Sequence, residues 1–301
     1  MNSPTNTGRT PAQRLDFTPI TERPRLSLPD GARVVVWPVI NVEDWDIQRP
    51  MARQVLPAPT AAPVLPDIAN WCWHEYGMRV GFWRLKAVLD QLGIRATLSI
   101  NGRVCDTYPA LAAAARDANW EFMGHGYIQM PTHQVDDQVK MIAQTLDTIE
   151  RFTGKRPVGW LGPGLTQTFD TVDHLAAAGI RYIGDWALDD QPVRFATNSG
   201  DMVAMPYTIE LNDIPMMAVQ HHRSDVFLER VKDSFERLYQ EGADQPRIMG
   251  IAVHPFLSGV PHRIKYFEQA MAYLKEQPGV VFWTGDQILD WYMTQTASKA
   301  Q

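Results

Sequence analysis

The stretch Val39-Ile40-Asn41-Val42-Glu43-Asp44 ends an apolar run that begins at Arg33. Residues 33–39 are rich in valine, which is typical of a buried strand. The run then ends in two adjacent carboxylates, Glu43 and Asp44, whereas a strand with only a structural role would end in an ordinary turn. Such a pair suits a site, because one acid stays ionised as a base or metal ligand while its charge shifts the pKa of its neighbour. The competing interpretation of this stretch is a solvated loop start.

The composition is that of an ordinary soluble globular protein, with 301 residues of which 45% are hydrophobic and 21% charged. This length suffices for one large α/β domain. The net charge of −6 comes from mixed signs, so we expect neither nucleic acid nor a membrane as a partner. Residues 1–29 lack the apolar core of a signal peptide, which predicts a cytoplasmic protein. Cys72 and Cys105 are expected to be packing residues without a disulfide.

Hydrophobic periodicity divides the chain into an extended arm over residues 1–30, a catalytic (β/α) barrel over 31–295 and a tail over 296–301. Residues 45–73 are rich in proline and too long for an ordinary connection, which predicts a lid or pocket wall. Strands are expected at 33–41, 95–100, 120–123, 158–161, 180–184, 202–209, 248–253 and 280–283. Helices are expected at 80–92, 109–118, 133–152, 169–178, 225–241, 262–275 and 284–292. Gly154 is expected to stop the third of these, and the spacing of Thr284 and Gln287 predicts a capping box at the start of the last. The alternation predicts a parallel sheet, and about eight strands favour closing it into a barrel.

Unusual polar residues recur where the predicted strands end. They are Asn41, Glu43 and Asp44 in the opening stretch, then His125 between two glycines, Gly162-Pro163-Gly164, Asp185 and His254. Catalytic groups of a parallel barrel lie at this end of its strands, so the coincidence favours a site. Taken singly, His125 is also compatible with a turn and His254 with a hydrogen-bonded core histidine.

In this order the motifs resemble the polysaccharide deacetylase superfamily, and more closely its branch of metal-independent allantoinases and related cyclic-amide or cyclic-imide hydrolases. The segments that carry the resemblance are 41–44, 76–84, 124–127, 153–160, 189–192, 206–207, 212–213, His254 and 259–263. The resemblance extends over residues 30–292. It implies a distorted (β/α) barrel of about seven strands, a homotetramer and hydrolysis of an amide-type carbon–nitrogen bond.

The resemblance also bears on a metal. In the metal-dependent members, the first acidic position activates water, and the second binds a divalent metal together with two histidines four residues apart. Glu43 and Asp44 match the acidic positions and His125 the first histidine, whereas Gln129 stands at the second. Asp44 and His125 alone make an incomplete zinc site, since zinc normally takes three protein ligands and water. We therefore expect no cofactor, with a zinc-dependent enzyme as the alternative.

These inferences predict a hydrolase of a small, cyclic amide, ureide or imide. Glu43 or Asp44 would activate water, and His254, oriented by Asp185, would protonate the leaving nitrogen. Arg79, His125 or backbone amides near Gly162 would stabilise the oxyanion. Residues assigned to substrate binding are Arg79, Trp160, Gly162, Pro163, Tyr207 and Asp213. The alternatives are a zinc-dependent N-deacetylase of an amino sugar and an inactive barrel that binds a small ligand.

Overall fold

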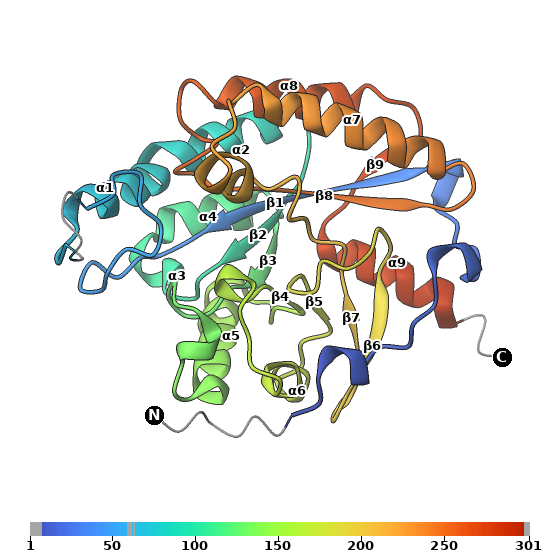
Figure 1. Cartoon of the computed structure of the whole chain (residues 1–301), viewed down its shortest axis with the longest axis horizontal. Coiled ribbons are helices and arrows are strands. Elements are labelled where there is room, and N and C mark those ends of the chain that lie inside the picture. Colours follow the sequence, from blue (N-terminus) through green and yellow to red (C-terminus); the bar gives the residue numbers. More distant parts are fainter. Residues whose placement is uncertain (1–7, 59–61, 63, 298–301) are drawn as a thin grey trace.

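Strand β1, Val34–Val42, lies next to the end strand β8 of the sheet, and all 9 of its residues are buried. It pairs in parallel with β8, Arg247–Val253, with β2, Thr97–Ile100, and with β9, Val280–Phe282. A strand buried on both faces needs apolar side chains at successive positions, which explains its run of valines. The computed structural model that gives this arrangement describes residues 8–58, 62 and 64–297 (Figure 1).

The sheet follows the order β6-β7-β5-β4-β3-β2-β1-β8 and curls into an open half-barrel. Its remaining strands are β3, Glu121–Gly124, β4, Gly159–Trp160, β5, Tyr182–Ile183, β6, Val193–Thr197, and β7, Gly200–Ala204. Every pairing is parallel except that of β6 with β7. Between β7 and β8, the chain adds only an isolated parallel bridge from Asn212 to Ala252. The predicted barrel-like α/β fold is confirmed, and the sheet is less closed than the strand count suggested.

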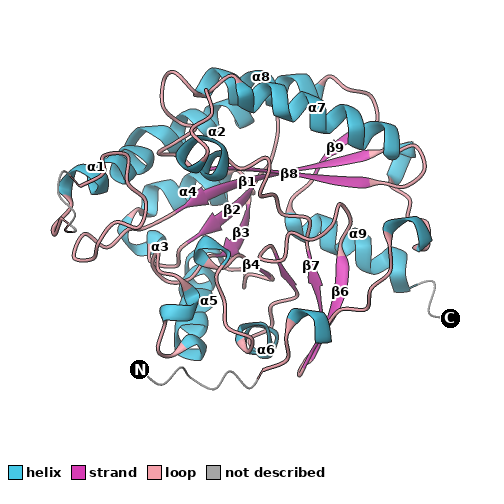
Figure 2. Ribbon diagram, in the orientation of Figure 1, coloured by secondary structure: helices cyan, strands magenta, loops and turns pink. Residues whose placement is uncertain are grey.

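Helices surround this sheet (Figure 2). They are α1, Ile68–Tyr76, α2, Phe82–Gln91, α3, Val104–Thr107, α4, Pro109–Asp117, α5, Gln138–Thr153, α6, Thr171–Ala177, α7, Val226–Glu241, α8, Ile264–Lys275, and α9, Gly285–Ala297. The α5 helix ends at Gly154, whose φ of 76° is left-handed as a helix stop requires. At the start of α9, the Thr284 backbone N–H donates to Gln287 Oε1, which is one half of the predicted capping box, and the Thr284 hydroxyl donates to the same oxygen.

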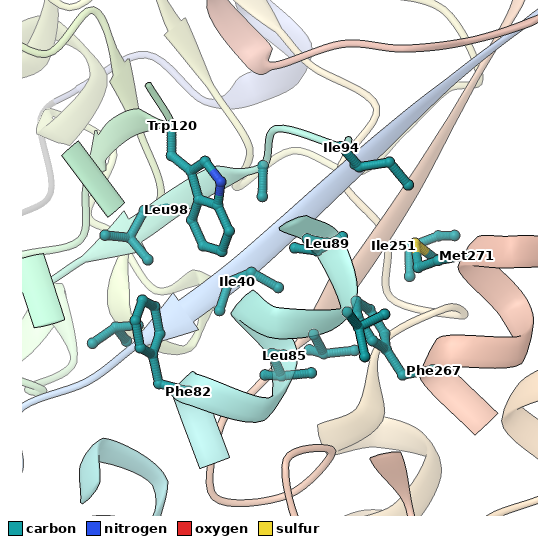
Figure 3. Close-up of a cluster of buried hydrophobic side chains, with 14 of the residues drawn as sticks. Ile40, Phe82, Leu85, Leu89, Ile94, Leu98, Trp120, Ile251, Phe267 and Met271 are labelled. Atoms are coloured by element: carbon teal, nitrogen blue, oxygen red, sulfur yellow. The ribbon is translucent and has the colours of Figure 1, made fainter. Parts of the chain in front are cut away.

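The two faces of β1 contact different cores. Val34, Val36, Ile40 and Val42 belong to the outer cluster beneath the helices, where Phe82, Leu85 and Leu89 of α2 also pack (Figure 3). Val35, Trp37 and Val39 belong instead to an inner cluster with Ile288, Leu289 and Tyr292 of α9. Asn41 continues the inner face, so alternation along the strand turns its amide toward the inside of the curled sheet.

Several predicted boundaries are wrong for physical reasons. The helix expected from residue 133 begins at Gln138, because the Asp137 side chain caps it by accepting from the Lys140 N–H. Strand β6 was not predicted; it pairs with β7 as an antiparallel hairpin, outside the parallel alternation. The extended segment expected over 202–209 ends as a strand at Ala204. The predicted lid is irregular only to Asp67, whose side chain caps α1.

The described part of the N-terminal arm packs against the domain of the same chain. Arg14 contacts Asp173 at 2.5 Å, and Arg23 contacts Asp189 at 2.5 Å. Residues 1–7 of the arm and 298–301 of the predicted tail lie outside the described residues. Cys72 is exposed and Cys105 is buried, and both are free thiols. Within the described chain, no helix has both the length and the apolarity needed to cross a membrane.

Candidate active site

A cavity of about 510 Å³ opens where β1, β3, β4 and β8 end. Its polar walls include Asn41, Glu43, His125, Gln129, Tyr207 and His254. The turn at residues 161–166 and the lid residues Trp45 and Arg53 also line the cavity. This is the end of a parallel sheet at which barrel enzymes place their chemistry. The size falls in the range of small-molecule pockets.

Glu43 lies between two imidazoles and is only 8% exposed. Its Oε2 accepts a hydrogen bond from the Trp45 indole at 3.1 Å, and its Oε1 accepts one from the Gln129 amide at 2.8 Å. The same Oε1 lies 3.6 Å from Nε2 of His125 and 3.5 Å from Nε2 of His254. A buried carboxylate with donors on both oxygens is held in one orientation, with its reactive face toward the histidines.

His254 is oriented by Asp213, which is fully buried. The Nδ1 atom of His254 lies 2.7 Å from Asp213 Oδ1, and the His254 backbone N–H donates to Oδ2 at 2.8 Å. The Ser258 hydroxyl donates to the same Oδ2 at 2.6 Å. Because the carboxylate accepts, Nδ1 carries a proton and Nε2 faces Glu43. Asp213, His254 and Glu43 therefore form a continuous chain.

The charges of this chain shift the pKa values in opposite directions. Burial alone would lower the pKa of His254, but the negative charges of Asp213 and Glu43 outweigh it and raise this pKa to about 10. Burial alone would raise the pKa of Glu43, but the positive charge of the neighbouring His254 outweighs it and holds this pKa well below its usual value. At neutral pH the resting site thus contains a Glu43 carboxylate beside a His254 imidazolium.

His125 presents the opposite tautomer. Its Nδ1 lies 2.6 Å from the Leu161 carbonyl oxygen, which only accepts, so Nδ1 is the donor. The Nε2 atom is buried, and among the described residues it has no hydrogen-bond partner. In the neutral ring this nitrogen offers a lone pair toward Glu43. The arrangement suits a water molecule that donates to both Glu43 and His125.

The hydroxyl of Tyr207 is left free to donate. It accepts a hydrogen bond from the Asn41 amide at 3.1 Å and a longer one from the Asn212 amide at 3.4 Å. These two bonds occupy both lone pairs of the phenol oxygen, so its O–H points to another acceptor. Burial raises the pKa of Tyr207, which keeps the phenol protonated. Since Tyr207 lines the cavity, a bound ligand is the acceptor at hand.

Asp44 forms an ion pair with Arg103. Arg103 Nε lies 2.7 Å from Asp44 Oδ2, and Arg103 Nη2 lies 2.8 Å from Oδ1, while Thr107 donates to Oδ2 at 2.9 Å. Both carboxylate oxygens are therefore used. In the described part of the chain, no group of three or more His, Cys, Asp or Glu side chains is arranged to hold a metal ion. The donor set around Asp44 and His125 does not fit a zinc site.

Gln129 stands at the position that the family resemblance assigns to a second histidine, and its amide contacts both sides of the site. Its Nε2 donates to Glu43, and its Oε1 accepts from Asn101 at 3.3 Å. The Asn101 Oδ1 in turn accepts from the Asp44 backbone N–H at 2.8 Å. Gln129 thus supports Glu43 in the place where a histidine would bind metal.

The lid is tied to Glu43 through aromatic rings. The Trp45 indole, which donates to Glu43, stacks on His74 of α1 with ring centroids 4.2 Å apart and planes 18° apart. His74 Nε2 lies 3.3 Å from the Arg53 carbonyl oxygen. Burial lowers the pKa of His74 to about 4, so this ring is neutral at neutral pH. Asn70 adds a further anchor by accepting from the backbone N–H groups of Val55 and Leu56.

Asp185 does not orient His254, in contrast to the prediction. Its Oδ1 accepts from the Gly162 N–H at 2.9 Å, and its Oδ2 is buried with no partner among the described residues. Burial raises the pKa of Asp185 to about 7. Asp213 takes the predicted role because the Asn212–Ala252 bridge places it beside the end of β8. Asp213 is therefore not available to substrate, for which it was also predicted.

Other assigned residues lie outside the cavity. The Arg79 side chain is 77% exposed and contacts Glu75 at 3.3 Å, so it supplies no oxyanion donor. Trp160 is fully buried in the core, where it packs against Gly124. Asp44 does not line the cavity, because Arg103 holds it elsewhere. Gly162 and Pro163 do line it, but the Gly162 N–H is already donated to Asp185.

Sequence reasoning gave no chemical role to Asn41, Trp45, Arg53, Gln129 or Asn212, all of which line the cavity. It did place Asn41 among the polar strand ends, and Trp45 and Arg53 in the predicted lid or pocket wall. Spacing could have suggested two of them. Trp45 follows Glu43 by two positions, and Gln129 follows His125 by four, the interval of the second family histidine. Arg53 and Asn212 lie on irregular segments, where no helix or strand periodicity predicts the direction of a side chain.

Comparisons with known proteins bear on the family and the fold of this chain. The polysaccharide deacetylase family model matches residues 73–183. The crystal structure of Puue allantoinase superposes with a TM-score of 0.82 at 24% identity, covering 90% of this chain and 94% of that one. A probable polysaccharide deacetylase from Pseudomonas aeruginosa PAO1 gives a TM-score of 0.80 at 24% identity, covering 91% and 95%. Both likenesses establish the fold.

Among curated relatives, a peptidoglycan deacetylase-like protein from Gibberella zeae is 26% identical over 252 residues, which cover 69% of this chain and 74% of that protein. The chain is thus similar in sequence to polysaccharide deacetylases over residues 73–183, and it has the fold of the polysaccharide deacetylase and allantoinase structures, in agreement with the resemblance of its motifs.

Proposed function

We propose that this protein hydrolyses a carbon–nitrogen bond in a small, cyclic amide, ureide or imide, with acid–base activation of water. The observation that carries the proposal is the position of Glu43 Oε1, between Nε2 of His125 at 3.6 Å and Nε2 of His254 at 3.5 Å. One carboxylate, one imidazole nitrogen without a partner among the described residues and one imidazolium thus converge on the cavity. These are the groups that amide hydrolysis requires.

The size of the cavity supports a small substrate. About 510 Å³ accommodates a heterocycle with its substituents, and lid residues Trp45 and Arg53 form part of its wall. A polymer substrate would need an open groove that continues past the reacting bond. The lid stands on one side of this cavity and is fixed by the Trp45–His74 stack.

In the proposed reaction, a water molecule bound between Glu43 and His125 attacks the substrate carbonyl carbon. Glu43 takes one proton from this water as the new carbon–oxygen bond forms. His254 then gives its Nε2 proton to the leaving nitrogen, and the carbon–nitrogen bond breaks. Loss of that proton removes the positive charge that lowers the Glu43 pKa, so proton donation by His254 makes Glu43 a stronger base.

Tyr207 is the proposed donor to the oxyanion. The Asn41 and Asn212 amide groups both donate to the Tyr207 oxygen, so neither of them accepts its O–H. A fixed donor aimed at the developing negative charge stabilises the tetrahedral intermediate without reorganising in the transition state. This replaces the role first assigned to Arg79.

We further propose that the reaction is independent of metal, because the Arg103 guanidinium neutralises Asp44 and uses both of its oxygens. The names of the relatives favour the second candidate, a zinc-dependent N-deacetylase, and the two are separable. Protein purified without chelators would keep its activity after EDTA treatment and contain no stoichiometric metal. Loss of activity with EDTA, restored by zinc, would support the deacetylase instead.

The decisive test is a substrate screen with a matched variant. Ring opening of allantoin, hydantoins and succinimide, and acetate release from N-acetylglucosamine oligomers, would be assayed side by side. We expect ring opening, and we expect Glu43→Gln to lower its rate by about 10²- to 10⁴-fold. An unchanged rate in this variant would exclude Glu43 as the base. Absence of turnover on every compound would favour the inactive, ligand-binding alternative.

A further inference from the structure

We infer that Arg53 binds a carboxylate carried by the substrate, so that the preferred substrate is a small cyclic amide or imide with an acidic side group. This deepens the proposed function and rests on it. The starting observation is that Arg53 is the single lysine or arginine among the described residues that line the cavity. Its guanidinium makes no hydrogen bond or ion pair with any residue that the structure describes.

The backbone of Arg53 is fixed relative to the reacting groups. Glu43 accepts from Trp45, Trp45 stacks on His74, and His74 Nε2 lies 3.3 Å from the Arg53 carbonyl oxygen. Because neutral His74 can donate to that carbonyl, the connection holds at neutral pH. The Arg53 backbone is therefore fixed at one side of the cavity, and its exposed, unpartnered guanidinium is free to turn toward a ligand from that side.

The distribution of charge sets the orientation of a ligand. The inner chain of Asp213, His254 and Glu43 holds two carboxylates and one imidazolium. An anionic group placed against it would be repelled, whereas a neutral amide would not. Arg53 offers the opposite charge on the lid. A substrate with one carboxylate thus binds with its amide at Glu43 and its acid at Arg53, and the planar guanidinium fork matches a carboxylate in two hydrogen bonds.

The test compares two ligands of nearly equal shape, hydantoin-5-acetate and hydantoin-5-acetamide. Binding would be measured by calorimetry with Glu43→Gln protein, which blocks turnover, and kcat/KM would be measured with Glu43 intact. We expect Arg53→Gln to weaken the acid by about tenfold or more and the neutral amide by less than about twofold. The matched control is Arg49→Gln, because Arg49 lies in the same segment, pairs with Asp46 at 3.5 Å and does not line the cavity.

Equal effects of Arg53→Gln on both ligands, no effect on either, or no binding of either ligand would overturn the inference. Failure of the proposed function is a different result. Binding of the acid that depends on Arg53, without ring opening by the enzyme, would refute the hydrolase and leave the anion site in place. Ring opening that is insensitive to Arg53 would do the reverse.

Discussion

Asp213 sets both the orientation and the charge of His254, through contacts of 2.7 Å to Nδ1 and 2.8 Å to the backbone nitrogen. Its negative charge is one of the two that raise the His254 pKa to about 10. A general acid works only while it holds its proton, so kcat/KM should fall above about pH 10. Asp213→Asn removes the charge and should move this alkaline limb to lower pH, with a loss of about 10²-fold in kcat/KM at neutral pH.

The control for this prediction is Ser258→Ala, which removes a neighbour of Asp213 but keeps the carboxylate. Its alkaline limb should stay within about one pH unit of that of the natural protein. A pH profile separates the charge effect from simple loss of structure. If Asp213→Asn lowered the rate with the limb unmoved, Asp213 would support the fold alone.

At the scale of elements, the end of β1 is joined to α3 by the ion pair of Asp44 and Arg103. The Asp44 side chain is 6% exposed and that of Arg103 is 30% exposed. Removing only the cation leaves a buried carboxylate without its charge partner, which typically costs about 3 kcal/mol. Arg103→Met should therefore lower the free energy of unfolding by about that amount, measured by urea denaturation.

The double variant Asp44→Asn with Arg103→Met isolates this effect, since it removes both charges. It should recover part of the lost stability. A double variant as unstable as the single one would mean that packing of the Arg103 side chain matters more than its charge. Activity of the refolded double variant would also show whether Glu43 still points into the cavity.

How far the sequence predicts an element depends on whether its signal is local. The β1 strand, the glycine stop of α5 and the capping box of α9 are encoded within a few residues, and all were predicted. Glu43, His125 and His254 follow strands directly, so one rule placed them at the cavity. The Arg103–Asp44 pair joins positions 59 apart. Asp213 reaches His254 only through a bridge on an irregular segment. Neither contact has a local signature.

At the scale of the whole molecule, a second buried network lies in the curled sheet. Glu121 accepts hydrogen bonds from Thr97 at 2.7 Å and Tyr182 at 2.6 Å, and the Thr97 hydroxyl accepts from the Trp37 indole at 2.7 Å. Burial, with the charge of Asp286 added, raises the pKa of Glu121 to about 7. The folded state therefore binds a proton more tightly than the unfolded state does.

The sign of the stability effect follows from this difference. Between the ordinary pKa of 4.5 and about 7, the folded protein holds more protons at Glu121, so its stability falls as pH rises through this window. Glu121→Gln does not titrate and should lack this fall. Relative to the natural protein, the variant should gain of the order of 2 kcal/mol between pH 5 and pH 8. Urea denaturation at both pH values measures this difference in the free energy of unfolding, and the control is Glu236→Gln at an exposed position.

In the proposed reaction, the distance of 3.5 Å between Glu43 Oε1 and His254 Nε2 would also govern how the protein recovers after each turnover. When the products form, Glu43 holds the proton taken from water and His254 has given its own away. Regeneration then needs a single proton to cross from one neighbour to the other, with no exchange with the buffer. A site that restores itself in this way needs no proton path to bulk solvent, and only substrate, water and product have to pass its entrance.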